Sequence, residues 1–113
     1  MGLFGKKEDS RKEYNQALDN LNSTETVRDR VHFQQVFDND DPVKIADILI
    51  AGQPLVLDFG ELNIDEANKD LAFLAGVTYA LKGEVIHIIE SIYLFARSTD
   101  FSDGSLDEMI REI

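Results

Sequence analysis

The feature that most restricts the fold of this chain is a short run of large apolar residues, Leu55-Val56-Leu57, between a proline and an aspartate. A strand with one face in water alternates apolar and polar side chains, whereas this run is apolar at every position. Residues 54–59 are therefore predicted to form a central strand that is covered on both faces. A chain of 113 residues can bury one such core and is too short for two domains.

A helix is predicted before this strand. Asp41 followed by Pro42 is a favourable helix start, because a carboxylate N-cap precedes a proline whose missing N–H costs nothing at that position. Gly52 is placed to end the helix. Its apolar face is made by Val43, Ile45, Ala46, Ile48 and Leu49.

A longer helix is predicted after the strand, from Asn63 or Asp65 to a C-cap at Gly83. Gly76 lies inside it, next to Ala75, and a glycine there costs about 1 kcal/mol relative to alanine. Close approach of another backbone would explain that cost, so we predict Ala75 and Gly76 as a self-association contact. The alternative is that the helix bends or packs on its own sheet at this point. The apolar face of the helix is Ala67, Leu71, Leu74, Thr78 and Leu81.

Three further strands and a closing helix complete the pattern. Strands are predicted over 31–37, 85–89 and 92–95, the last two joined by Glu90-Ser91, and a helix capped by Ser105 runs to the C-terminus. The order is β-α-β-α-β-β-α, and the predicted fold is an α/β, compact βαββ-type sandwich that dimerises. Both faces of the hairpin are apolar, so one packs on the two helices. The other needs the C-terminal helix, a partner subunit or a bound peptide.

The charge of the chain narrows the class of partner. The net charge is −11, and all of the excess lies in residues 31–113, which hold five basic and sixteen acidic groups. Such a field repels nucleic acid and suits a basic peptide. Cysteine is absent, which excludes a disulfide framework, thiolate zinc sites and cysteine catalysis.

The sequence offers no recognisable catalytic or metal-binding motif. His32 and His87 lack the spacing of zinc ligands, and no phosphate-binding or nucleophile motif occurs. The acidic cluster Asp38, Asp40 and Asp41 lacks the spaced ligands of a calcium loop, and we interpret it as a turn followed by a helix N-cap. We therefore predict that the protein is not an enzyme and uses no metal or cofactor.

The N-terminal residues 1–30 are predicted to be a membrane-targeting tip and a linker, ahead of a domain over 31–113. Leu3 and Phe4 precede Lys6 and Lys7, and apolar groups beside cations suit the boundary between acyl chains and anionic headgroups. The alternative is an unstructured terminus without that role. No membrane span or secretory signal is evident, which predicts a cytoplasmic location.

Three segments together are similar to a known family. The helix residues 44–49 (KIADIL), the strand residues 54–58 (PLVLD) and the helix residues 73–83 (FLAGVTYALKG) resemble the core of the SepF cell-division family, as does the strand 91–95 (SIYLF). The short tip, linker and domain also follow the layout of that family. The resemblance covers residues 31–113 and the general character of the tip.

The resemblance implies a binding module. SepF-like proteins anchor the tubulin-like division protein FtsZ to the membrane: the N-terminus inserts at the bilayer surface, the domain dimerises, and the dimer grips the C-terminal peptide of FtsZ. His87 and Tyr93 match family positions that contact this peptide, and Gly76 matches a helix-mediated self-association surface. The family often has a basic residue at the position of His87 and a glycine at that of Ile89.

A different class of function is also compatible with the residues. A small dimeric α/β regulatory domain could bind a metabolite at the dimer seam, and a purely structural self-associating protein would need no FtsZ contact. A ligand pocket with convergent polar groups would favour the former. The acidic domain argues against the latter, because it suits a peptide that carries basic residues.

Overall fold

The structure, a computed structural model, describes residues 25–113. The predicted membrane contacts Leu3, Phe4, Lys6 and Lys7 lie outside the described residues. The predicted α/β class and the order β-α-β-α-β-β-α are confirmed, with two 3₁₀ turns added. The elements are η1 (Val27–Arg30), β1 (His32–Gln35), α2 (Pro42–Ile50), β2 (Leu55–Asp58), α3 (Ile64–Ala80), β3 (Gly83–Ile89), β4 (Ile92–Arg97), η2 (Ser98–Phe101) and α4 (Ser105–Glu112).

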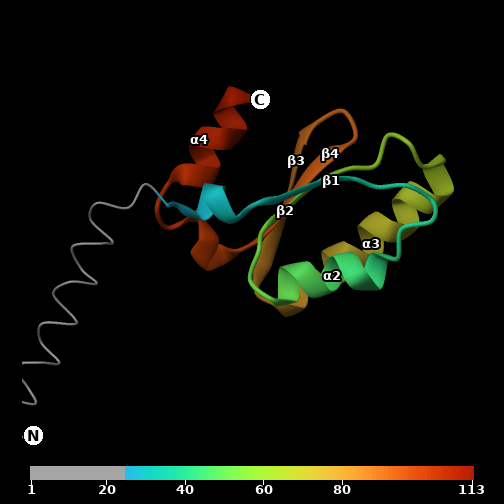
Figure 1. The fold of residues 1–113 in the computed structure, drawn as a ribbon, viewed down its shortest axis with the longest axis horizontal. Coiled ribbons are helices and arrows are strands. Elements are labelled where there is room, and N and C mark those ends of the chain that lie inside the picture. The colour runs from blue at the N-terminus through green and yellow to red at the C-terminus, as the bar shows by residue number, and fades with distance from the viewer. Residues whose placement is uncertain (1–24) are drawn as a thin grey trace, which may run out of the picture.

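The strands form one mixed sheet in the order β1-β2-β4-β3 (Figure 1). β1 and β2 are parallel because α2 carries the chain back between them, whereas β4 is antiparallel to both β2 and β3. The register places His32 opposite Leu55 and Leu55 opposite Phe95. β2 is therefore an interior strand, as its apolar run predicts, and β1 and β3 are the two edges.

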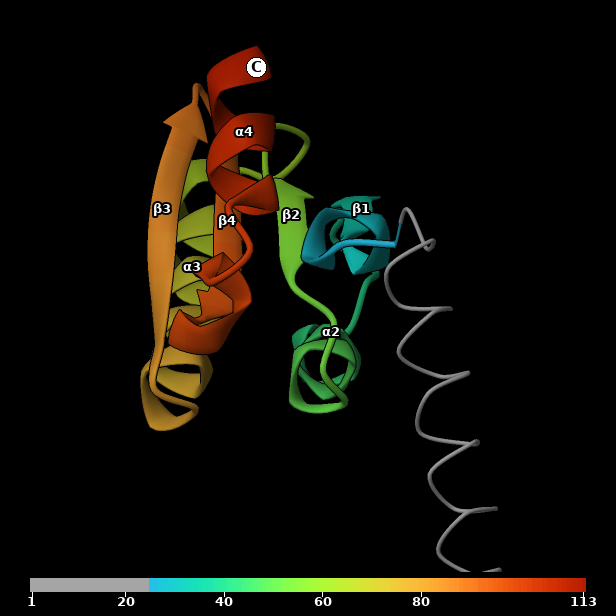
Figure 2. The same cartoon turned by 90° about the vertical axis from the view of Figure 1, so that its left-hand side faces the viewer.

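Helices lie on both faces of the sheet. α2 and α3 cover one face and α4 covers part of the other (Figure 2). Leu55 and Leu57 point to α2 and α3 and are fully buried, while Val56 points to α4 and is 7% exposed. The prediction that residues 55–57 are covered on both faces is confirmed. Burial of each leucine contributes about 1.5–3 kcal/mol, so this strand is the centre of the core.

Local capping signals place the two helix starts as predicted. Asp41 Oδ1 accepts a hydrogen bond from the Val43 amide at 2.9 Å, and Asn63 Oδ1 accepts one from the Glu66 amide at 2.9 Å. Each bond satisfies an N–H that has no partner inside its helix. Gly52 follows the end of α2 with φ of +116°.

Two predicted caps are wrong. The cap of α4 is Gly104, with φ of +79°, because the Ser105 hydroxyl is used elsewhere: it donates to Asp103 Oδ1 and accepts from the Arg28 amide.

The predicted C-cap of α3 is the second error. α3 ends at Ala80, and Lys82 takes the left-handed conformation. Gly83 instead begins β3, where a Cβ would collide with the Ala96 carbonyl. β1 is also shorter than the predicted 31–37.

Candidate functional site

The tip of the β3–β4 hairpin carries a row of aromatic rings on the face of the sheet that α2 and α3 share. His87 and Tyr93 are cross-strand partners, and their rings stack with centroids 4.7 Å apart and 27° between planes. Tyr93 meets Phe59 edge to face at 6.0 Å, and Phe59 meets Phe95 at 6.3 Å. The row runs from the exposed His87 ring to the fully buried Phe95. The two predicted partner-binding residues are thus brought together.

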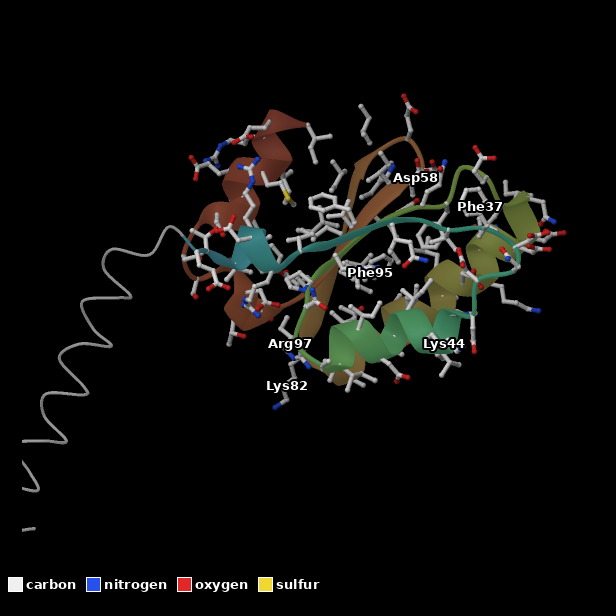
Figure 3. The ribbon with its side chains drawn as sticks, viewed as in Figure 1. Phe37, Lys44, Asp58, Lys82, Phe95 and Arg97 are labelled. Atoms are coloured by element: carbon white, nitrogen blue, oxygen red, sulfur yellow. The ribbon has the colours of Figure 1, made fainter. Side chains whose placement is uncertain are left out.

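Hydrogen bonds hold this tip in place. Asp58 Oδ1 accepts from Ser91 Oγ at 2.6 Å and from the Gly60 amide at 2.8 Å, and the Phe59 amide donates to the Ser91 carbonyl at 3.0 Å. Asp58 therefore ties the loop after β2 to the hairpin turn, beside which it lies in Figure 3. His87 Nε2 lies 2.6 Å from the Glu90 carbonyl, which can only accept, so Nε2 carries the proton. We refer to His87, Tyr93, Phe59 and the Asp58–Ser91 contact as the hairpin site.

The end of the sheet that holds the hairpin site is strongly acidic. β1 and β2 are parallel and the hairpin turn pairs with the end of β2, so three loops meet at this end. Residues 36–41, 58–63 and 90–91 contain no lysine or arginine. This acidic end would attract a cationic partner. Its acidic residues are Asp38, Asp40, Asp41, Asp58, Glu61 and Glu90.

Part of this acidity is structural. Asp40 Oδ2 accepts from the Phe37 amide at 2.8 Å, and Asp41 caps α2, so the interpretation of this cluster as a turn and an N-cap is confirmed. Within residues 25–113, no group of three or more histidine, cysteine, aspartate or glutamate side chains is arranged to hold a metal ion.

The outer face of α3 holds the predicted self-association residues. Gly76 is exposed, and a Cβ added to it would meet no atom within 4 Å. The alternative that Gly76 packs on the domain's own sheet is therefore wrong. Ala75 is half-buried at the flank of this face. We call the exposed set around Gly76 the α3 outer face: Ala72, Phe73, Gly76, Tyr79 and Ala80.

α4, one of the three predicted options, covers the hairpin part of the second face of the sheet. Leu106 and Met109 pack on Val56, Leu94 and Ala96. η1 fastens α4, because the Arg28 guanidinium makes two hydrogen bonds to Glu112, at 2.8 and 2.7 Å. The Val27 amide also donates to Asp103 Oδ2 at 3.0 Å. Beyond α4 an open hollow of about 270 Å³ remains, lined by Phe33, Gln34, Gln35, Val56, Asp58 and Ile92.

Sequence reasoning missed three parts of these surfaces. Phe59 was predicted only as the end of a strand, although its spacing from Leu57 places it on the aromatic face. Asp58 and Ser91 carry no local signal, because strand pairing brings them together from 33 residues apart. Phe73 and Tyr79 could have been found from the helical period, since they lie away from Leu74 and Thr78.

Among the helices of residues 25–113, none is both long and apolar enough to span a membrane.

Comparison with known proteins gives one consistent family. The family described as "Cell division protein SepF" matches residues 31–99, more than half of the chain. Proteins named "Cell division protein SepF" are similar to it in Lacticaseibacillus casei (31% identical over 70 residues) and in Carboxydothermus hydrogenoformans (36% over 64 residues). These matches cover 62% and 57% of this chain, and 46% and 47% of the relatives. The match thus spans about half the length of these curated relatives. The chain belongs to the SepF family of cell division proteins.

Proposed function

We propose that this SepF-family chain is a cell-division adaptor. It binds the C-terminal peptide of FtsZ at the hairpin site and tethers the division ring to the inner face of the cytoplasmic membrane, as a dimer or a larger polymer. The observation that carries the proposal is the His87–Tyr93 stack, exposed at its outer ring and held at an acidic end of the sheet.

The hairpin site has the physical properties of a peptide anchor. Its rings are held by stacking and by the hydrogen bond from His87, so little side-chain freedom is lost when a partner binds. Aromatic residues that are already positioned commonly dominate binding energy. The surrounding carboxylates favour a peptide with basic residues.

Calorimetric titration of the full-length chain with the C-terminal peptide of the same organism's FtsZ tests this proposal. The expected Kd is micromolar, about −8 kcal/mol. Tyr93→Ala should weaken binding by about 2 kcal/mol, or thirtyfold. Phe33→Ala is the matched control, because it removes an aromatic ring that is 60% exposed on the other face of the sheet.

Two outcomes would contradict the proposal. The peptide could fail to bind a folded protein, or the Phe33 and Tyr93 variants could lose affinity equally. His87→Ala separates binding from folding, because the His87 side chain is exposed and its removal leaves the core intact.

We also propose that the α3 outer face mediates self-association. Gly76 lets a second backbone approach, and the exposed Phe73 and Tyr79 flank it with apolar area. Gly76→Glu should reduce the sedimentation-derived association constant by at least tenfold, because it places a charge in a close contact. Asn68→Glu adds the same charge two turns earlier on the same helix and should have little effect.

For the membrane tether we propose the predicted tip residues. Burial of Leu3 and Phe4 gives at most ~2 kcal/mol each, and Lys6 and Lys7 add about 1 kcal/mol each at an anionic surface. Their total is small for a monomer, so stable binding requires several tips on one assembly.

A further inference from the structure

The edge of the sheet next to the hairpin site is open. β3 is the terminal strand of the order β1-β2-β4-β3, and in residues 25–113 no element lies beyond it (Figure 2). Its seven residues include no proline and one charged side chain, Glu84. An edge of this kind presents unpaired N–H and C=O groups that can pair with another extended chain.

The pairing of β3 with β4 identifies which groups point outward. The Lys82 carbonyl accepts from the Ser98 amide at 3.2 Å, so Lys82 is bonded toward β4. Antiparallel pairing alternates, and it directs the N–H and C=O groups of Glu84 and Ile86 to β4 as well. Those of Gly83, Val85 and His87 therefore point to the free edge. The register shift between His87 and Ile89 ends this run.

The row of outward-pointing backbone groups, from Gly83 to His87, ends at the hairpin site. His87 contributes its ring to the stack with Tyr93 and its backbone to the open edge. A chain laid along Gly83–His87 would thus lie beside the aromatic row. Its side chains would alternate between the face of Val85 and the face of Ile86, both of which are apolar.

We propose that an extended, basic peptide adds to β3 as a fifth strand and ends at the His87–Tyr93 stack. The inference rests on the proposed function, because the peptide is the one assigned there to the hairpin site. Backbone pairing supplies affinity in this mode of recognition, and pockets for alternate side chains supply specificity.

Charge favours a peptide over a second copy of this chain at the edge. Residues 31–113 hold eleven more acidic than basic groups, so a second copy would bring further negative charge to the edge beside Glu84 and Glu90. Glu84 on the strand and Glu90 in the turn would instead attract lysine or arginine on the incoming strand.

Amide exchange in the full-length chain tests the inference directly. The Ile86 amide is bonded to β4 and should be protected without peptide, whereas the Val85 and His87 amides should exchange quickly. With free FtsZ C-terminal peptide at ten times its Kd, exchange at Val85 and His87 should slow by about tenfold.

Removing single backbone N–H groups, in the protein or in the peptide, tests the proposed hydrogen bonds between β3 and the peptide. Val85→Pro removes an outward N–H and leaves the β3–β4 bonds in place. It should bind the peptide about five- to tenfold more weakly than Val85→Ala, which loses the same packing but keeps the N–H. Because a proline variant can fail to fold, N-methylation of single peptide residues gives a second readout on the unaltered protein. Loss of affinity should recur at every second residue.

The outcomes distinguish this inference from the proposed function. Binding that depends on Tyr93, with a uniform N-methylation profile and unchanged exchange at Val85 and His87, overturns the added strand alone. Absence of peptide binding overturns both. Protection of Val85 and His87 in the peptide-free dimer, lost in Val85→Pro together with dimerisation, assigns the edge to a second copy and overturns the inference.

Discussion

Two glycines in the unit formed by α3 and β3 are present for different physical reasons. Gly83 lies where the strand passes so close to β4 that a Cβ would collide with the Ala96 carbonyl and come within 2.9 Å of Thr78 Cγ2. Gly76 lies on an exposed helix face with open space around it. The fold of a single chain requires the first glycine and gains nothing from the second.

This contrast predicts opposite effects of the same substitution. Gly83→Ala should lower the free energy of unfolding by about 1–3 kcal/mol, because backbone must shift to admit the methyl group. Gly76→Ala should raise it by about 1 kcal/mol through helix propensity. Urea denaturation of both variants at low protein concentration measures the two changes, and effects of equal sign would contradict this account.

At the scale of elements, α4 depends on its contacts with η1. Hydrogen bonds from the Ser105 side chain, the Val27 amide and the Ser105 amide hold the pKa of Asp103 below its usual 3.8. The hydrogen bond from Arg28 likewise lowers the pKa of Glu112. A carboxyl group whose pKa falls on folding stabilises the folded state above its ordinary pKa, and this contribution disappears as the pH falls through the folded value.

Acidification should therefore break the contacts of α4 at a higher pH than it opens the sheet. Amide exchange in α4 should accelerate as the pH falls below about 4, after correction for intrinsic rates. Asp103→Asn should remove much of this pH dependence, because its side chain no longer titrates. Amides of β2, buried between two layers, serve as the internal reference; equal acceleration there would indicate global unfolding.

The sequence predicted the elements better than their arrangement. Caps and periodicity are local, so Asp41, Asn63 and the apolar run of β2 marked their elements correctly. The Ser105 cap prediction failed because its hydroxyl bonds to two residues that precede α4, Asp103 and Arg28, the second of them 77 positions away. The strand order and the contact between Asp58 and Ser91 depend on long-range pairing, which no short motif encodes.

The candidate site was predicted in part. His87 and Tyr93 were taken from the family resemblance, and hairpin register explains why they meet. Phe59 and the open edge of β3 were not predicted, because the first joins the site across strands and the second follows from the strand order. The Leu3–Lys7 tip stays a prediction.

At the scale of the whole molecule, the net negative charge should control the association rate constant of the peptide. Raising the ionic strength from about 0.05 to 0.5 M shortens the screening length to a few ångströms. The association rate constant of the FtsZ peptide should fall by about tenfold while dissociation changes little. Stopped-flow measurements at several salt concentrations test this; a salt effect confined to dissociation would contradict steering by the acidic end.

Membrane binding should depend on assembly. Phe4→Glu in the full-length chain should abolish flotation with anionic liposomes while circular dichroism stays unchanged. Gly76→Glu should weaken flotation strongly with the tip intact, because fewer tips act together. Flotation that survives Phe4→Glu would assign the membrane contact to another part of the chain.

The positions of η1 and the hairpin turn have a mechanical consequence. Val27–Arg30 leads into β1 at one end of the sheet, and the turn between β3 and β4 lies at the other (Figure 1). If the N-terminal residues Leu3–Lys7 bind the membrane and the hairpin site binds FtsZ, tension between them runs along the strands. The bonds between β1 and β2 are then loaded in shear, all at once, rather than peeled one by one. The sheet would then resist the tension, and the first contacts to break would be the hydrogen bonds between η1 and the α4 region, from Arg28 to Glu112 and from Val27 to Asp103.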